Sequence, residues 1–218
     1  TPSNSSAASD VYKRQGKTTL VKLLLGYFAP TSGNIFLGDT PLQDYDMTSW
    51  RHSCGVVLQD SHVFSESLAR NIAVEDKHID RTRLRTAARQ ANLEEFIEKL
   101  PLKYQTMVGA EGVGLSRGQE QRIFIARALY KDPSFVFLDE ATNSLDANNE
   151  RIITGNLLDF CKGRTVLIVA HRLSTIRHAD KIVVLHKGRI VEEGTHDELC
   201  ARHGHYYELI NNQLIAMG

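Results

Sequence analysis

The chain has 218 residues, of which 42% are hydrophobic, and its 26 basic and 26 acidic side chains give a formal net charge of zero. This balance argues against a nucleic-acid-binding protein, which carries a surplus or a stripe of basic residues. The length and the hydrophobic content allow one substantial core, so we expect one domain with a subdomain rather than two independent domains. The apolar runs are short, and none reaches the roughly 20 residues that a membrane-spanning helix needs.

The first fifteen residues differ in character from the rest of the chain. Residues 5–15 read Ser-Ser-Ala-Ala-Ser-Asp-Val-Tyr-Lys-Arg-Gln, a string that resembles a translated adapter from a sequencing library. We therefore expect residues 1–15 to be a non-native tail and exclude them from the fold. A natural polar tail is the alternative.

The first predicted elements after this tail are a helix and two strands. Residues 17–28 carry apolar side chains nearly all round, which indicates a buried helix that ends before Pro30 and Gly33. The short apolar runs 34–37 and 54–58 predict strands, and a polar, turn-rich link separates them.

From about residue 65 to residue 130 the pattern becomes helical. One segment repeats apolar residues at the spacing i, i+3, i+4, i+7 of a single helical face, at Leu84, Ala87, Ala88 and Ala91. A second helix is expected around residues 96–100, and Pro101 ends it. These segments predict a helical insert between strands.

After Pro133 the strand pattern returns. The runs 135–138, 166–170 and 182–185 are continuously apolar, as in strands that are covered on both faces. A predicted helix at about 148–161 separates the first two runs, which indicates a β-α-β unit with parallel strands. Lys187-Gly188-Arg189 predicts a hairpin turn. Together the elements predict an α/β protein with a mainly parallel sheet and an inserted all-helical subdomain.

A phosphate-binding motif stands at the start of the first helix. Gly16-Lys17-Thr18-Thr19 matches the end of the pattern G-x-x-x-x-G-K-[ST]. Such a loop surrounds phosphate oxygens with backbone N–H groups at the positive end of the following helix. Lys17 would reach the β and γ phosphates, and Thr18 would offer its hydroxyl to Mg²⁺. This tetrapeptide alone is weak support, and its weight depends on the motifs that follow.

The segment Leu115-Ser116-Arg117-Gly118-Gln119 opens a predicted helix over 119–130. Ser116 and the N–H groups near Gly118 can therefore present hydrogen-bond donors to a phosphate. Ser116 also suits the simpler role of a helix cap.

Two more motifs end apolar runs. The run 135–138 leads into Asp139 and Glu140, paired carboxylates at the C-terminal end of a strand, where ligands bind in open α/β sheets. The alternative for this pair is a helix N-terminus, where acidic side chains are favoured by the helix dipole. His171 closes the run 166–170, although one histidine among 9 is more often an ordinary surface or core residue.

In this order the motifs resemble those of the ATPase subunits of ABC transporters, which have a P-loop NTPase fold. The resemblance extends from Gly16 to about Gln213. It implies that the chain binds ATP with Mg²⁺, that Asp139 holds the Mg²⁺ through water, and that Glu140 polarises the attacking water as a general base. It also implies that His171 hydrogen-bonds the γ-phosphate.

The same resemblance implies the remaining site residues. Gln59, at the end of the strand 54–58, would contact Mg²⁺ and link the site to a transmembrane partner. The segment 115–119 resembles the ABC signature, Leu-Ser-Gly-Gly-Gln, and is called the signature below. It would cover ATP held by a second nucleotide-binding domain in a head-to-tail dimer, and Asp146 would cross that interface. The implied nucleotide-binding residues are Gly16, Lys17, Thr18, Thr19, Gln59, Ser116, Gly118, Gln119, Asp139 and Asp146, and the implied metal-binding residues are Thr18, Gln59 and Asp139.

The chain departs from the family pattern at three positions. The first glycine of the phosphate loop falls at Val11, and a further glycine of this family falls at Arg14. Glycine is needed there because the backbone approaches the phosphates and takes positive φ. The strands before this loop and the aromatic residue that stacks on adenine have no counterpart either, so we expect poor ATP binding. Arg117 stands where the family usually has glycine, and we expect it to be tolerated with some loss of activity.

Several details favour the exporter branch of the family. Gly109-Ala110-Glu111-Gly112 is similar to the exporter X-loop, and residues 189–196 and Tyr206-Tyr207 also resemble exporters. Arg117 and the run 141–144 resemble bacterial peptide or bacteriocin exporters that carry a peptidase domain. The implied partner is the transmembrane domain of the same exporter, at the cytoplasmic face of the bacterial inner membrane.

The expected domain organisation follows from these motifs. Residues 16–218 form one ABC ATPase domain, with a catalytic core over 16–64 and 131–218 and a helical subdomain over about 65–130. Two other functions remain open. One is a folded, non-catalytic fragment that has lost ATP binding with its loop, and the other is a soluble ABC ATPase that does not transport. The neutral charge counts against nucleic acid as the partner of such an ATPase.

Overall fold

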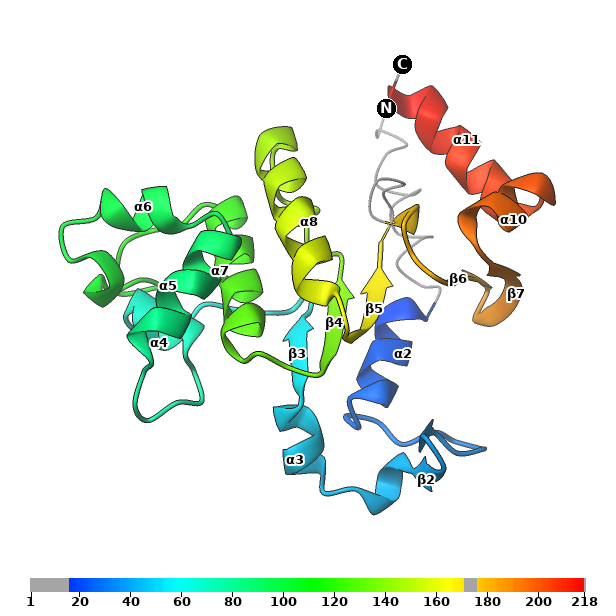
Figure 1. The fold of residues 1–218 in the computed structure, drawn as a ribbon, viewed down its shortest axis with the longest axis horizontal. Coiled ribbons are helices and arrows are strands. Elements are labelled where there is room, and N and C mark those ends of the chain that lie inside the picture. The colour runs from blue at the N-terminus through cyan, green and yellow to red at the C-terminus, as the bar shows by residue number, and fades with distance from the viewer. Residues whose placement is uncertain (1–15, 171–175, 218) are drawn as a thin grey trace, which may run out of the picture. The chain divides into compact units, whose positions relative to one another are not determined.

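The computed structural model describes residues 16–170 and 176–217 (Figure 1). The chain divides into two compact units, one made of residues 1–42 with 169–218 and the other of residues 43–168. Each unit has a hydrophobic core of its own. In the part of the chain that the structure describes, no helix combines the length and the apolar character required to cross a bilayer.

The unit 43–168 is built on a three-stranded sheet. Its strands lie in the order β3–β4–β5, with bounds β3 Cys54–Val57, β4 Phe135–Asp139 and β5 Thr165–Val169. Strands β3 and β4 are parallel, with Cys54 opposite Phe135 and Val57 opposite Leu138. The parallel sheet that the apolar runs predicted is therefore present, and the carboxyl ends of β3 and β4 lie at the same edge.

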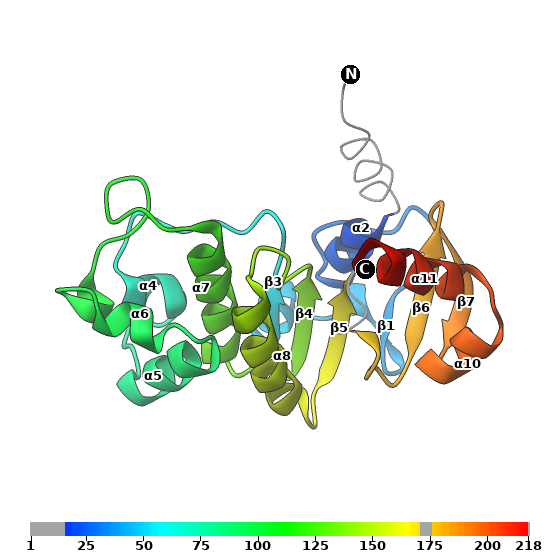
Figure 2. The same ribbon diagram turned by 90° about the horizontal axis from the view of Figure 1, so that it is seen from above.

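The stretch between β3 and β4 is helical, as predicted. Its elements are α4 (Leu68–Ile72), α5 (Arg81–Gln90), α6 (Glu94–Glu98), the 3₁₀ turn η2 (Lys103–Gln105) and α7 (Arg117–Tyr130). These helices gather beside β3, at the side of the sheet away from β5 (Figure 2). The predicted face of α5 is buried at Leu84, Ala87 and Ala88. Helix α8 (Ala147–Cys161) joins β4 to β5 and buries three apolar residues, Ile153, Leu157 and Phe160.

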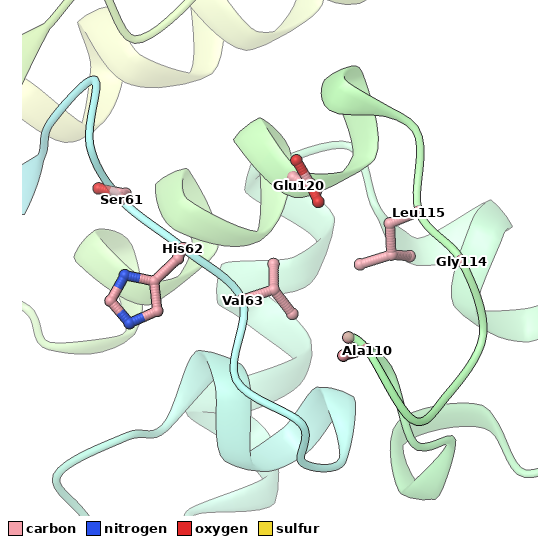
Figure 3. Close-up of a pocket in the computed structure, with 8 residues that line it drawn as sticks. Ser61, His62, Val63, Ala110, Gly114, Leu115 and Glu120 are labelled. Carbon is pink, nitrogen blue, oxygen red and sulfur yellow. The ribbon is translucent and has the colours of Figure 1, made fainter.

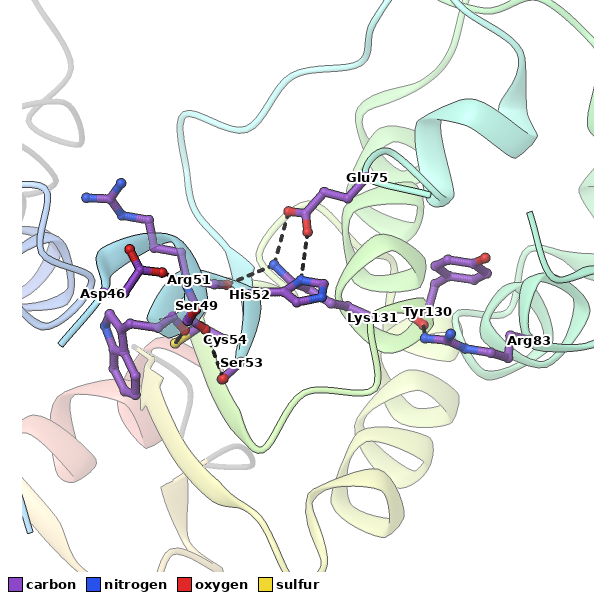
Figure 4. Close-up of polar contacts among 11 residues, drawn as sticks. Asp46, Ser49, Arg51, His52, Ser53, Cys54, Glu75, Arg83, Tyr130 and Lys131 are labelled. Atoms are coloured by element: carbon purple, nitrogen blue, oxygen red, sulfur yellow. Dashed lines mark hydrogen bonds and ion pairs between the residues drawn. The ribbon is translucent and has the colours of Figure 1, made fainter. Parts of the chain in front are cut away.

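Polar contacts fasten the short helix α3 (Met47–His52), which precedes β3, to the helical stretch (Figure 4). The Glu75 carboxylate lies 3.1 Å from His52 Nδ1 and 3.1 Å from Lys131 Nζ. Lys131 Nζ also donates a hydrogen bond of 2.8 Å to the carbonyl oxygen of Arg51. These contacts join the end of α3 to the segment after α4 and to the end of α7.

The other unit begins with α2 (Lys17–Leu24), which is shorter than the predicted helix over 17–28. The reason is Gly26, whose φ of 66° is left-handed. The N–H of Tyr27 donates to the carbonyl of Lys22 at 2.9 Å and that of Gly26 to Leu23 at 3.0 Å. This pair of hydrogen bonds is a Schellman motif, which ends a helix at a glycine.

The strand predicted over 34–37 is also shorter than expected. Only β1 (Phe36–Leu37) is paired, and it pairs antiparallel with β2 (Thr40–Pro41). Phe36 is 57% exposed, so the apolar character of this run does not reflect burial in this unit. The 3₁₀ turn η1 (Leu42–Asp44) follows β2.

The C-terminal part forms a hairpin covered by two helices. Strands β6 (Ile182–His186) and β7 (Arg189–Gly194) pair antiparallel, and the predicted turn has φ of 48° at Lys187 and 75° at Gly188. Two positive φ values are the signature of a type I′ turn. With α10 (His196–Ala201) and α11 (His205–Met217), the hairpin encloses a small core of Ile182, Val184, Leu199, Tyr206 and Ile210.

The prediction that this strand is covered on both faces is wrong in the unit as described. Val183 is 45% exposed between the buried residues Ile182 and Val184. That alternation is typical of an antiparallel strand with one face on the core and one face outward.

Glu192 of β7 caps the start of α11, and this contact gives a stability prediction. Its carboxylate accepts from the N–H of His205 at 2.8 Å and of Tyr206 at 2.9 Å. A Cβ at Gly204 would overlap the Glu192 Oε1, so Gly204→Ala should displace the cap. We expect Glu192→Ala and Gly204→Ala each to cost about 0.5–2 kcal/mol, the usual value of a helix cap.

The double variant should cost about as much as either single variant, because both remove the same two hydrogen bonds. Thermal unfolding checks this, with Glu193→Ala, whose carboxylate makes an exposed ion pair with Lys181, as the matched control. Additive costs would show that Gly204 acts through something other than the cap.

Candidate functional site

The paired carboxylates lie where strand β4 ends. Asp139 is the last residue of β4 and is 2% exposed, and Glu140 follows it directly. Glu140 has a φ of 54°, a left-handed conformation that residues with a side chain rarely adopt. The chain therefore turns sharply at Glu140, and its carboxylate leaves the strand at the carboxyl edge of the sheet. The alternative reading as a helix N-terminus is wrong, since α8 begins only at Ala147.

The Glu140 side chain is held by two amide groups. Its Oε2 accepts a hydrogen bond from Gln59 Nε2 and one of 2.6 Å from Asn143 Nδ2. Gln59 follows β3, the strand that pairs in parallel with β4. The structure thus brings together Gln59, Asp139 and Glu140, three predicted site residues from two segments some 80 residues apart in sequence.

The signature segment forms the start of α7. Ser116 is the N-cap residue: its Oγ accepts from the N–H of Gln119 at 3.2 Å, and the Gln119 Oε1 accepts from the N–H of Ser116 at 2.8 Å. The helix-cap role is therefore present. It is compatible with phosphate binding, because a hydroxyl that accepts a hydrogen bond can still donate its own proton.

Gly118 has a packing reason to lack a side chain. A Cβ on Gly118 would lie 3.3 Å from the carbonyl oxygen of Ser144, in the segment that follows Glu140. The first turn of α7 therefore approaches that segment closely. Arg117, the unusual residue of the signature, is exposed.

Sequence reasoning missed Gln121, which connects α7 to the carboxylate pair. Its Nε2 donates to the backbone carbonyl of Glu140 at 2.9 Å, and its Oε1 accepts from the N–H of Ser144 at 2.8 Å. Asn143, which contacts the Glu140 carboxylate, was missed as well. Both residues act through side-chain contacts that leave no periodic pattern in the sequence. Only their position next to recognised motifs could have pointed to them.

Asp146 caps α8. Its Oδ1 accepts from the N–H groups of Asn148 at 3.1 Å and Asn149 at 3.0 Å, and its Oδ2 accepts from the Asn149 side chain. The hydrogen bonds from the Asn149 backbone and side chain hold the pKa of Asp146 below its usual value. Asp146 therefore stays ionised at neutral pH, and its predicted place at a dimer interface stays a prediction.

The end of the phosphate loop belongs to the other unit. Gly16 precedes α2 with a φ of 86°, in the left-handed region that favours glycine. Lys17, Thr18 and Thr19 form the first turn of α2, whose N–H groups point toward the N-terminal end of the helix. This is the backbone arrangement that binds phosphate in other proteins. Val11, Arg14 and His171 lie outside the described residues.

A cavity of about 380 Å³ opens near the signature segment (Figure 3). The segment after Gln59 and the turn before the signature form most of its wall, and α7 contributes one acidic residue. Its lining is Ser61, His62, Val63, Gly109, Ala110, Gly114, Leu115 and Glu120.

Comparison with known proteins identifies relatives of this chain. The family model described as ABC transporter matches residues 15–143. The ATP-dependent lipid A-core flippase of Chromohalobacter salexigens is 46% identical over 194 residues, which are 89% of this chain and 34% of that protein. The flippase of the same name from Burkholderia orbicola is 47% identical over 192 residues, 88% of this chain and 32% of that protein. The chain thus spans about a third of the length of these curated relatives.

A solved structure of an ABC exporter is also similar to this chain. A bacterial Atm1-family ABC exporter with ATP bound superimposes with a TM-score of 0.87 at 38% sequence identity. The match covers 91% of this chain and 35% of the exporter chain.

Proposed function

The chain belongs to the ABC transporter family, as an ATP-binding domain of the exporter type, and from this premise we propose that it binds and hydrolyses ATP to power export across a membrane. The main support for this proposal is the position of the Glu140 carboxylate. Gln59 and Asn143 hold it by hydrogen bonds at the end of a buried strand. A general base must be positioned in this way to take a proton from an attacking water.

The proposed roles follow the chemistry of each side chain. Lys17 and the first-turn N–H groups of α2 would bind the phosphates of ATP, together with Gly16 just before the helix and Thr19 in its first turn. Glu140 would act on the water, and His171 would contact the γ-phosphate. A magnesium ion would be held by Thr18, Gln59 and Asp139, whose hydroxyl, amide and carboxylate oxygens are the ligands that this ion prefers. The ion would neutralise charge on the phosphates.

A second nucleotide-binding domain completes the proposed site. Ser116, Gly118 and Gln119 would cover the ATP held by a second copy, and Asp146 would lie at the same interface. Ser116 and Asp146 are exposed in the chain by itself, which suits contacts made across such an interface.

The proposed second partner is the transmembrane domain of the same exporter, with the chain at the cytoplasmic face of the membrane. The cavity beside the signature suits this contact, since Val63, Ala110 and Leu115 offer it an apolar wall. The segment after Gln59 forms part of that wall, so a domain seated there would touch the chain next to the glutamine that holds Glu140.

The test is phosphate release from ATP by a loop-restored chain, in which an intact phosphate-binding loop and its leading strands from the Chromohalobacter salexigens flippase replace residues 1–15. Because the proposed site is shared between two copies, the activity per molecule should rise with protein concentration. Lys17→Ala should abolish it. Absence of phosphate release at every concentration would favour the non-catalytic alternative.

A further inference from the structure

We propose that Gln121 is a positioning residue for Glu140, through a clamp that joins the signature helix to the turn after β4. The inference rests on the proposed function, because it assigns Gln121 a part in the same hydrolysis. Gln121 itself is not proposed to touch ATP or the attacking water.

The clamp is made by one carboxamide that holds both ends of a five-residue turn. Gln121 Nε2 donates to the carbonyl oxygen of Glu140 at 2.9 Å, and Gln121 Oε1 accepts from the N–H of Ser144 at 2.8 Å. Within the turn, the N–H of Asn143 also donates to the Glu140 carbonyl at 3.2 Å. Gln121 thus joins both ends of this turn to helix α7.

The turn needs such a contact because its first residue is strained. Glu140 has a φ of 54°, and a residue with a side chain keeps such a conformation only where its surroundings restrain it. Relaxation at Glu140 would swing its carboxylate away from Gln59 and Asn143, which hold it now. A donor fixed on the Glu140 carbonyl opposes that movement directly.

Only glutamine combines the two functions at this distance. Glutamate at position 121 would keep an acceptor for the Ser144 N–H but would face the Glu140 carbonyl with a second acceptor. Methionine has nearly the same length and neither function. Gln121→Glu therefore removes only the hydrogen bond to the Glu140 carbonyl, whereas Gln121→Met removes both hydrogen bonds.

The clamp also joins two parts of the proposed site. Ser116 caps α7, and Gln121 lies on the same helix less than two turns later. A shift of α7 as ATP engages the signature would be transmitted to the Glu140 backbone through Gln121. Gly118 leaves too little room for a side chain beside the Ser144 carbonyl, so the first turn of α7 also lies close to this turn.

The first test needs no nucleotide and uses the full chain as it is. Amide hydrogen exchange at Ser144 should become about 5-fold faster in Gln121→Met, the change expected for loss of one net hydrogen bond. Gln121→Glu should keep the slow exchange at Ser144. Gln105→Met, the same replacement at an exposed position of η2, should change nothing. Equal exchange in Gln121→Met and the unaltered chain would overturn the clamp.

The second test measures ATP turnover in the loop-restored chain. Gln121→Met should lower kcat about 10- to 100-fold, the cost of misplacing a catalytic group, while the Kd for ATP stays unchanged. Unchanged kcat would overturn the inference alone. A fall in kcat that is matched by weaker ATP binding and a lower melting temperature would assign Gln121 a merely structural role. No turnover in the unsubstituted loop-restored chain would overturn the proposed function and the inference with it.

Discussion

Glu140→Gln in the loop-restored chain lowers ATP turnover by at least about 100-fold and leaves ATP binding intact, if Glu140 is the general base. Glutamine preserves the size of the side chain at the end of β4 but cannot take a proton from water at neutral pH. The two amides that now hold the carboxylate, from Gln59 and Asn143, keep one acceptor oxygen to bind. Phosphate release and equilibrium ATP binding measure the two effects separately.

This variant should also accumulate as a dimer in the presence of ATP, because the nucleotide that closes two copies is no longer consumed. Size-exclusion chromatography with light scattering detects that dimer. Glu95→Gln is the matched control, the same replacement at an exposed ion pair with Lys99 on α6. Turnover that survives in Glu140→Gln would remove Glu140 from the base role.

Asn71→Leu should destabilise the unit 43–168 by about 3–5 kcal/mol, because it removes a buried carboxamide that makes several hydrogen bonds to partly buried backbone groups. Asn71 on α4 is 0% exposed. Its side chain accepts from the N–H of Phe64 at 2.8 Å and donates to the carbonyls of Phe64 at 3.0 Å and Glu66 at 3.2 Å. These contacts pin the segment that follows Gln59 onto the helices.

Arg127 of α7 adds to the cost. Its Nε donates to the Asn71 carbonyl at 2.8 Å, and its Nη2 reaches the Asn71 Oδ1 at 3.4 Å. Burial lowers the pKa of Arg127 to about 10, so the guanidinium stays charged at neutral pH. In Asn71→Leu this partly buried charge loses one of its acceptors.

Urea unfolding followed by the fluorescence of Trp50 measures the effect. Trp50 is the single tryptophan, and its ring lies 4.9 Å from that of Phe135 in the same unit. Asn148→Leu, at an exposed position of α8, should shift the unfolding free energy by no more than about 0.5 kcal/mol. Equal midpoints for the two variants would show that the Asn71 contacts contribute little to stability.

Much of the fold could be predicted because its signals are local. The apolar run 135–138, the helix over about 148–161 and the Lys187-Gly188 turn are each set by residues next to one another, and the structure has β4, α8 and the β6–β7 hairpin at these places. The errors arose where an apolar run does not report burial. The run 34–37 pairs over two residues only, and Val183 is exposed although its neighbours are buried.

Some residues of the candidate site could be predicted from the sequence, and others could not. The family resemblance predicted Gln59, Asp139 and Glu140 as site residues, and the structure places them near the ends of two parallel strands. Asn71 and Gln121 could not be predicted, because each acts through a side chain that reaches backbone groups of another segment. Asn143 could not, because its contact with Glu140 depends on the conformation of the turn that they share. No spacing in the sequence reports either kind of contact.

ATP binding by the domain is tested most directly by equilibrium binding of MgATP to three proteins: the chain with its own residues 1–15, the loop-restored chain, and the loop-restored chain with Lys17→Ala. Val11 and Arg14 fall at loop positions that need glycine, so we expect weak binding by the first protein and at least about 10-fold tighter binding by the second. Lys17→Ala should remove most of that gain in affinity. Absence of binding in the loop-restored chain would contradict the central claim that this chain is an ATP-binding motor domain.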